Sequence, residues 1–182
     1  MCAIECYSYS DYKMWEGDWE LIDGHPVSMA PAPVKKHQIL SGKIFSEFLK
    51  YLEECEECEV LIEEDYKIDD YTVLRPDVAV VCDDPNEEYI SKAPEIIVEV
   101  ISPSSAKKDE KIKFEIYEKE KVKYYVLIYP DDLKAKIFKL NGKIYEKEGD
   151  FFMEDYKFKI SCKEIKIDFK EVFKRFRKND SR

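Results

Sequence analysis

Glycine and long apolar runs are scarce in this sequence. Only five of its 182 residues are glycine, which excludes collagen-like and glycine-rich proteins. No apolar stretch approaches the ~20 residues that a membrane-spanning helix needs. Residues 1–18 lack the basic start and the apolar run of a secretory signal peptide. We therefore expect a cytoplasmic protein whose six cysteines are mostly reduced thiols.

The sequence also lacks a surplus of basic over acidic residues. Lys and Arg number 30 against 40 Asp and Glu, which gives a formal net charge of −10. A protein that coats nucleic acid would carry a basic field over its whole surface, so this balance argues against that class. It does not exclude a nuclease with a local basic rim around an acidic metal site. The length and the 45% of hydrophobic residues predict one folded domain over residues 1–182.

The apolar pattern predicts a mixed α/β fold. Continuous β-branched runs indicate strands buried on both faces, and apolar residues at helical spacing indicate amphipathic helices. A mixed central sheet with helices on its faces follows, with a core at about 12–135 and extra β-hairpins at about 135–182. The expected helices cover about 34–54, 106–121 and 170–178, and the expected strands 19–29 (a hairpin), 60–62, 66–68, 78–81, 96–101, 124–128, 135–147 (a hairpin at Asn141-Gly142) and 156–167 (a pair).

Two carboxylates lie in or next to the buried strands. Asp77 follows Arg75-Pro76 at the start of one strand, and Glu99 lies inside another. A carboxylate there is costly unless a basic partner, backbone donors or a divalent cation compensates it. Taken singly, each is better explained as a salt bridge or a turn cap. Together, at the ends of neighbouring strands, they can share one Mg²⁺ with waters and a phosphate.

The helix expected after Glu99 directs one lysine toward the sheet. On a helical wheel, Ile112 and Ile116 mark the buried face, which also carries Asp109, Lys113 and Tyr117. Near two carboxylates, Lys113 can neutralise a transition-state phosphate or position a water. An ion pair with Asp109 at i, i+4 is the alternative, and the two interpretations are compatible. The lysines expected to be solvated are Lys107, Lys108, Lys111 and Lys119.

The order and spacing of these segments resemble the putative restriction endonuclease family of the PD-(D/E)XK nuclease superfamily. The resemblance covers about residues 12–135. It rests on the following segments: the hairpin at 19–24, Met29–Pro33 with His37-Gln38, Arg75–Val81, Pro94–Ser105, Asp109-x3-Lys113-x3-Tyr117, and Tyr124–Pro130.

The resemblance implies a restriction-endonuclease-like core and a Mg²⁺-dependent endonuclease, with Mn²⁺ as the expected substitute. Asp77 matches the Asp of the PD motif and Glu99 the acidic residue of the (D/E)XK motif, so both would bind the metal. The sequence departs from the pattern at Ile101, where the motif has lysine, and Lys113 matches the place to which this family has moved it. Tyr129 replaces the usual Asp before Pro130, which we interpret as structural.

Further polar residues have less certain roles. Glu20 is a third candidate acid that matches a family position, and a role in holding its hairpin explains it equally well. Asp109, Tyr117 and His37 are, with Glu20, the expected supporting residues of the site, and we interpret His37 as a core or capping histidine rather than a catalytic base. Cys55-x2-Cys58, together with Cys2-x3-Cys6, matches a four-thiolate zinc site only weakly, and a fraying helix end is the preferred interpretation. Cys82 and Cys162 look like core residues.

Three hypotheses for function follow. The first is an endonuclease that cuts DNA phosphodiester bonds, with Asp77, Glu99 and Lys113 as its site. The second is a catalytically degenerate nuclease fold that binds nucleic acid or protein, which the net charge and the missing motif lysine favour. The third is a zinc-stabilised interaction module. We also expect a homodimer, because the C-terminal extension carries many aromatics for a small domain: Tyr145, Phe151, Phe152, Tyr156 and Phe158.

Overall fold

A six-stranded mixed sheet forms the centre of the protein. The computed structural model describes residues 5–29, 34–103 and 106–177, so Cys2, Pro31–Pro33, Ser104 and Ser105 lie outside the described residues. All neighbouring strands of the sheet are antiparallel except β7 and β8, which are parallel. The spatial order is β10 (Ile144–Phe151), β9 (Lys134–Asn141), β8 (Tyr124–Tyr129), β7 (Ile96–Val100), β6 (Val78–Cys82) and β3 (Cys58–Ile62).

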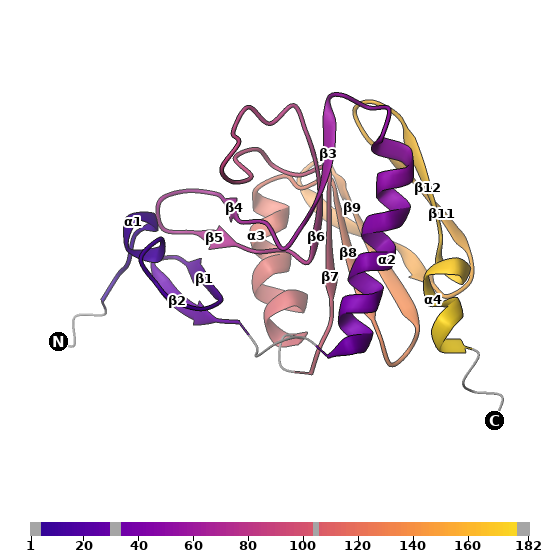
Figure 1. The fold of residues 1–182 in the computed structure, drawn as a ribbon, viewed down its shortest axis with the longest axis horizontal. Coiled ribbons are helices and arrows are strands. Elements are labelled where there is room, and N and C mark those ends of the chain that lie inside the picture. Colours follow the sequence, from indigo (N-terminus) through magenta and orange to yellow (C-terminus); the bar gives the residue numbers. More distant parts are fainter. Residues whose placement is uncertain (1–4, 30–33, 104–105, 178–182) are drawn as a thin grey trace.

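Two smaller sheets flank this centre. One has the order β2 (His25–Ser28), β1 (Trp19–Ile22), β5 (Val73–Leu74) and β4 (Tyr66–Lys67), and it packs with the short helix α1 (Tyr9–Tyr12) through aromatic rings. The other pairs β11 (Asp155–Lys159) with β12 (Glu164–Asp168). Figure 1 shows the four-stranded sheet beside the central sheet at the N-terminal side of the molecule.

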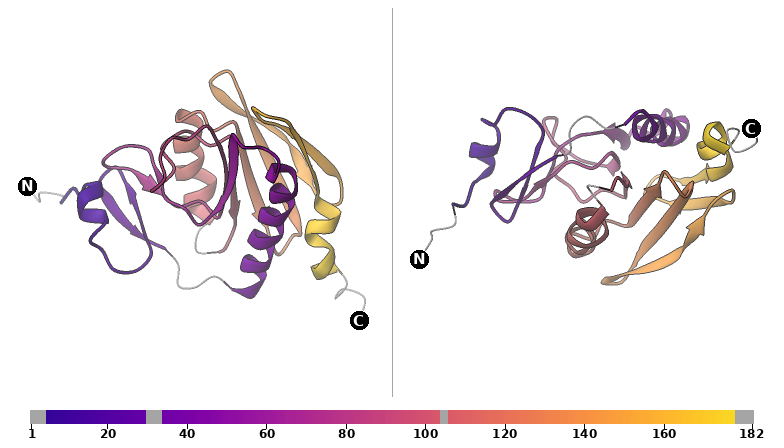
Figure 2. Two further views of the ribbon diagram at one scale, coloured as in Figure 1. Left: turned by 45° about the horizontal axis from the view of Figure 1, so that its top comes forward. Right: turned by 90° about the horizontal axis from the view of Figure 1, so that it is seen from below.

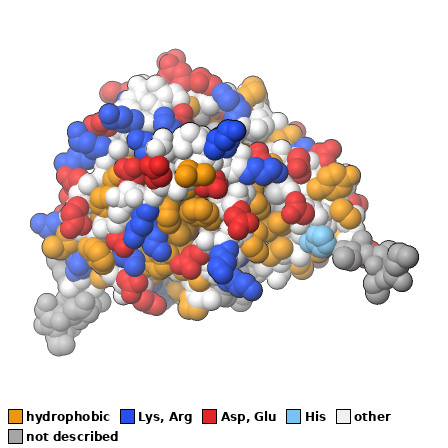
Figure 3. All heavy atoms as spheres, turned by 180° about the vertical axis from the view of Figure 1, so that it is seen from behind, with side chains coloured by type: hydrophobic (Ala, Val, Ile, Leu, Met, Phe, Trp, Pro, Cys, Tyr) orange, Lys and Arg blue, Asp and Glu red, His pale blue; other side chains and the backbone are white. Residues whose placement is uncertain are grey.

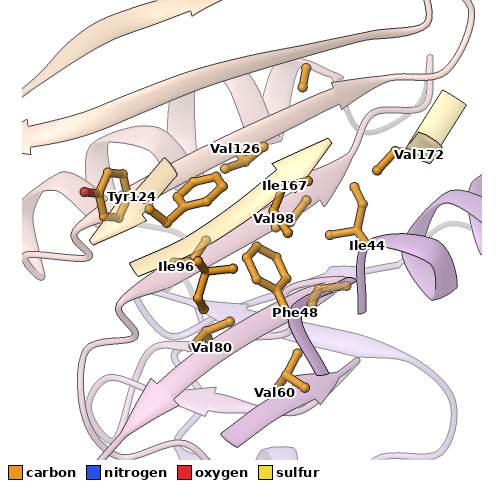
Figure 4. Close-up of a cluster of buried hydrophobic side chains, with 14 of the residues drawn as sticks. Ile44, Phe48, Val60, Val80, Ile96, Val98, Tyr124, Val126, Ile167 and Val172 are labelled. Atoms are coloured by element: carbon orange, nitrogen blue, oxygen red, sulfur yellow. The ribbon is translucent and has the colours of Figure 1, made fainter. Parts of the chain in front are cut away.

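Helices cover both faces of the central sheet. Helices α2 (Lys35–Leu52) and α4 (Phe169–Arg177) lie on one face, and α3 (Phe114–Lys119) lies on the other, as the view from below in Figure 2 shows. On the α2 side, Phe48 packs edge-on against Phe158, and Val80, Val98 and Val126 extend this core across the sheet (Figure 4). On the α3 side, alternate residues of the same strands pack around Tyr117 and Tyr125. Both faces of β6, β7 and β8 are therefore buried, as their continuous apolar sequences predict.

The expected fold class and most elements are confirmed, with one local difference. The segment before α3 is a π-helix, η1 (Lys108–Lys113), rather than a regular α-helix. Its wider turn rotates Ile112 out of the apolar face, and that side chain is 44% exposed, so its predicted burial is wrong. The short elements α1 and β5 were not predicted, because neither carries a periodic pattern long enough to identify.

The aromatic residues of the C-terminal extension are mostly buried within the chain itself. Tyr145 and Phe158 lie in the two cores, and Phe151 and Tyr156 pack against the core on the α2 side. Of the predicted aromatic set, Phe152 is the exposed member, at 42%. The strand β10 forms one edge of the central sheet.

Four cysteines are paired as disulfides, which differs from the expected reduced thiols, whereas Cys82 lies in the core and Cys162 packs against it, as expected. Cys55 bonds to Cys162, and Cys58 bonds to Cys82. Cys6 is a free, exposed thiol beside Gly24 in the turn between β1 and β2. Among the described cysteines, the sulfur that joins those of Cys55 and Cys58 is that of Cys162, so the weakly matched grouping with Cys6 is not formed. In the described ranges, no helix is both long and apolar enough to cross a membrane.

Candidate active site

Asp77 directly precedes β6, and groups from β7 and α2 contact one of its two carboxylate oxygens. Its Oδ2 accepts a 2.6 Å hydrogen bond from the backbone N–H of Val100, at the end of β7. The same Oδ2 lies 3.2 Å from Nε2 of His37, on the first turn of α2. The strand register pairs Val78 with Val98, so Asp77 stands opposite Glu99 just beyond the last pair. The two sequence-predicted carboxylates are thus brought together at one end of the sheet.

Glu99 is buried on the face of β7 that meets η1 and α3. Its Oε1 accepts hydrogen bonds from Nζ of Lys113 at 2.8 Å and from the hydroxyl of Tyr117 at 3.1 Å. The Tyr125 hydroxyl, which lies beside this pair, donates to the backbone carbonyl of Asp109 at 2.9 Å. The carboxylate inside the apolar strand therefore has a basic partner and a hydroxyl donor, as its burial requires.

Lys113 connects Glu99 to Glu20. The Lys113 side chain is only 2% exposed, and its Nζ lies 2.7 Å from Oε1 of Glu20. Asp109 is farther away, with Oδ1 at 3.8 Å from that Nζ. Glu20 is fully buried on β1, and its Oε1 also accepts the backbone N–H of Arg75 at 3.0 Å. Glu20 therefore belongs to the same cluster as Glu99, which favours the site interpretation over a purely local role in the hairpin.

The π-helix brings a second lysine into this cluster. Nζ of Lys108 lies 2.6 Å from Oε2 of Glu20, so the prediction that Lys108 is solvated is wrong. A π-helix forms i→i+5 hydrogen bonds, and its wide turn places residues five apart, such as 108 and 113, on nearly the same face. A regular α-helical wheel separates them by more than a third of a turn. Lys107, Lys111 and Lys119 are exposed, as expected.

Burial and charge shift the ionisation of these groups in different directions. Burial alone would raise the pKa of Glu20, but Lys113 and Lys108 outweigh it and hold that pKa below its ordinary value. Burial raises the pKa of Glu99 well above its ordinary value, because Lys113 offsets only part of the cost and three other carboxylates add to it. Burial lowers the pKa of Lys113, but the surrounding carboxylates more than reverse this and keep it charged.

The sequence between residues 9 and 155 matches the model of a protein family, Uma2, described as "Putative restriction endonuclease". The chain belongs to this family. Its fold is also similar to the crystal structure of a protein from Anabaena variabilis ATCC 29413 described as "a putative nuclease belonging to DUF820", with a TM-score of 0.72 and 18% sequence identity. That likeness covers 92% of this chain and 97% of the other, and at this identity it shows the fold. Among curated proteins, no significant match was found.

The carboxylates of this site are suitable ligands for the divalent cation that a restriction endonuclease-like family generally uses. Both contacts of Asp77 run to Oδ2, and both contacts of Glu99 run to Oε1. Within the part of the chain that the structure describes, no group donates to Asp77 Oδ1 or to Glu99 Oε2. Each carboxylate thus keeps one oxygen for a hard cation, and oxygen ligands are what Mg²⁺ and Mn²⁺ prefer.

Sequence reasoning missed three features of this site. Lys108 was excluded by the α-helical wheel, and the π-helix leaves no clear sequence signal. His37 was expected only as a supporting core or capping residue, and its contact with Asp77 was not foreseen; burial lowers the pKa of His37, but Asp77 outweighs burial and raises it. Its Nδ1 is buried without a hydrogen-bond partner among the described residues. Arg75 was noted only as a motif residue, yet its guanidinium binds Asp65 and Asp18 beside the site.

Proposed function

We propose that this member of the restriction endonuclease family is a Mg²⁺-dependent endonuclease that hydrolyses DNA phosphodiester bonds. The observation that carries the proposal is the position of Lys113, whose buried ammonium contacts Glu99 directly across from Asp77. Metal-assisted phosphodiester hydrolysis requires two carboxylates, each with an oxygen that can bind the metal, and one fixed cationic side chain. Family membership supports the same class of reaction.

Each residue has a distinct proposed role. Asp77 and Glu99 would hold the cation, which when bound activates a water and stabilises the leaving oxygen. The Val100 N–H and His37 fix the orientation of Asp77, and Tyr117 fixes that of Glu99. Lys113 would direct its charge at the scissile phosphate or position the attacking water, which is the role of the missing motif lysine at Ile101. Glu20 and Asp109 contact the same ammonium and would hold Lys113 in place.

The surface charge is consistent with local rather than general attraction of nucleic acid. On the face that carries α3, basic and acidic side chains are interspersed (Figure 3). Lys107 and Lys111 are exposed on the first turns after β7, close in sequence to Lys108 and Lys113. A short basic rim of this kind can meet a few phosphates without a wide basic field, and each phosphate contact adds to the salt dependence of binding.

The experiment that tests the proposal compares DNA cleavage by matched lysine variants. Lys113→Met removes the charge and keeps the stem, and cleavage with Mg²⁺ or Mn²⁺ should fall by roughly 10²–10³, the scale of one preorganised electrostatic contact. Because this lysine is a buried ion-pair partner, the variant also leaves Glu99 without its cationic partner and leaves Glu20 with Lys108 alone.

Lys111→Met is the control, because Lys111 is exposed on the same helical segment and should keep nearly wild-type cleavage. Equal losses of cleavage in the two single variants would indicate that a diffuse basic surface, and not one catalytic lysine, supports the reaction. The free energy of unfolding of both variants, measured in urea, separates a loss of cleavage from a loss of folding; loss of cleavage only in proportion to the unfolded fraction would show that Lys113 acts through folding alone.

The second candidate is a catalytically degenerate nuclease fold that binds nucleic acid or protein. The ion pairs of Lys113 favour it, because Glu20 and Glu99 already bind the ammonium. The net charge of −10 and Ile101 at the motif position point the same way. Wild-type protein that retards DNA or RNA in a gel, yet cuts neither with Mg²⁺ or Mn²⁺, would decide for this candidate.

A further inference from the structure

Four cysteine sulfurs gather at the end of the central sheet away from Asp77. Cys55 lies between α2 and β3, Cys58 begins β3, Cys82 ends β6, and Cys162 lies in the turn between β11 and β12. In Figure 1 the α2–β3 connection and the β11–β12 turn meet at the top of the molecule. Asp77 and Cys82 stand at opposite ends of β6, about 16 Å apart at the ~3.3 Å that a strand rises per residue. The cysteine cluster is therefore separate from the candidate active site.

The sulfurs approach one another more closely than pairwise bonding requires. The Sγ atoms of Cys55, Cys58 and Cys162 all lie within 4.8 Å of one another, although Cys55 and Cys58 belong to different disulfides. Cys82 lies outside this group of three, but its Sγ is bonded to that of Cys58, its direct partner in the β3–β6 register, so it is the nearest candidate for a fourth ligand. In a tetrahedral site with Zn–S bonds of about 2.3 Å, neighbouring sulfurs are about 3.8 Å apart. Two separate disulfides do not require sulfurs of different pairs to lie this close, whereas one shared ion does, and three of the four sulfurs already meet that requirement.

We propose that the reduced forms of Cys55, Cys58, Cys82 and Cys162 bind one Zn²⁺ ion. Cys55-x2-Cys58 has the ligand spacing of structural zinc sites, and four thiolates are the soft donor set that zinc occupies as a closed tetrahedron. The two disulfides give this set when each accepts two electrons and two protons from a dithiol, which becomes a disulfide in turn. The four thiols then release their protons as the ion binds.

The surroundings suit a buried thiolate site in two ways. Cys55, Cys58 and Cys82 are buried and Cys162 is half-buried, so the ion would be closed off from water, as in a structural site. Lys163 follows Cys162, and its ammonium binds the carbonyl of Tyr51 at the end of α2, which offsets part of the negative charge.

The proposed ion would fasten the C-terminal extension to the central sheet. It would join the end of α2, the β3–β6 edge and the β11–β12 hairpin, three segments far apart in the sequence. Because binding to the folded state alone adds to stability, removal of the ion should lower the melting temperature of the whole chain. Neither Asp77 nor Glu99 takes part.

The test measures metal in the full chain, purified without oxygen in the presence of a phosphine reductant. We expect about one zinc per chain by elemental analysis, and Co²⁺ in its place should give the intense visible absorption of a tetrahedral cobalt thiolate. Cys162→Ser and Cys82→Ser should each lose the zinc and that absorption. Cys6→Ser is the matched control, because Cys6 is a free, exposed thiol, and it should keep both. Asp77→Asn should keep both as well.

The cobalt titration of the wild-type chain needs no variant, so it decides the question even if a serine variant fails to fold. Wild-type protein with all its thiols reduced that gives no cobalt–thiolate absorption would overturn the proposal. Iron with acid-labile sulfide in place of zinc would overturn it, and so would zinc that survives in a folded Cys162→Ser variant.

Discussion

Nζ of Lys113 lies 2.7 Å from Oε1 of Glu20, in a contact that joins two sheets. Glu20 comes from β1 of the four-stranded sheet, and Lys113 follows the central strand β7 through its crossover segment. Both side chains are almost fully buried. The same ammonium contacts Glu99, so the N-terminal hairpin helps to fix the position of a group in the candidate active site. A buried charge held in this way is costly to leave unpaired.

Glu20→Gln should destabilise the fold. The substitution keeps the shape of the side chain but leaves Lys113 and Lys108 with one negative partner fewer. Removing one partner of a buried ion pair costs about 3–5 kcal/mol, and we expect the lower end because Glu99 still contacts Lys113. The free energy of unfolding, measured in urea, should fall accordingly. Glu16→Gln changes an exposed carboxylate just before the same strand and should leave that free energy nearly unchanged.

The destabilisation by Glu20→Gln should shrink in acid. The pKa of Glu20 in the folded protein lies below the ordinary value of 4.5, because Lys113 and Lys108 outweigh the effect of burial. A lowered folded-state pKa gives a contribution to stability that is present above 4.5 and is lost as the pH falls through the folded-state value. The difference in unfolding free energy between wild type and variant should thus be constant from pH 5.5 to 7 and smaller below about pH 4. A difference that grows on acidification would contradict the assignment of this carboxylate as ionised.

We predict that the chain forms a homodimer at micromolar concentration. The edge of the central sheet at β10 and nearby exposed apolar side chains are the surface that would be covered. These side chains are Ile144, Phe152 and Met153. Light scattering should report twice the chain mass of 21.6 kDa. The double variant Phe152→Ser, Met153→Ser should shift the measured mass toward that of a single chain. A single-chain mass for the wild type would contradict the prediction.

Much of the fold could be predicted from the sequence because long periodic segments determine it. The apolar spacing around Leu40, Ile44 and Phe48 predicts α2, and the β-branched runs predict β6 and β7. Asn141-Gly142 predicts the β9–β10 turn. The same reasoning brought Asp77, Glu99 and Lys113 to one place, since a polar group inside an apolar segment must find a partner.

The rest depends on contacts that no local pattern encodes. Lys108 joins the site because η1 is a π-helix, and a wheel drawn at 3.6 residues per turn places it elsewhere. Glu20 reaches Lys113 across 93 residues of sequence, so its role depends on how the small sheet packs. Cys162 meets Cys55 only when the C-terminal hairpin folds back, and sequence spacing instead suggested Cys6.

The binding of Mn²⁺ to three carboxylate variants tests the central claim most directly. Asp77→Asn and Glu99→Gln keep the shape of each side chain and remove the charge that a hard cation needs. Calorimetry should show that wild-type protein and the control Glu115→Gln, an exposed change on α3, bind Mn²⁺ alike, while Asp77→Asn and Glu99→Gln each lose that binding and stay folded. Mn²⁺ binding at wild-type strength in both folded variants would place the cation elsewhere and contradict the account.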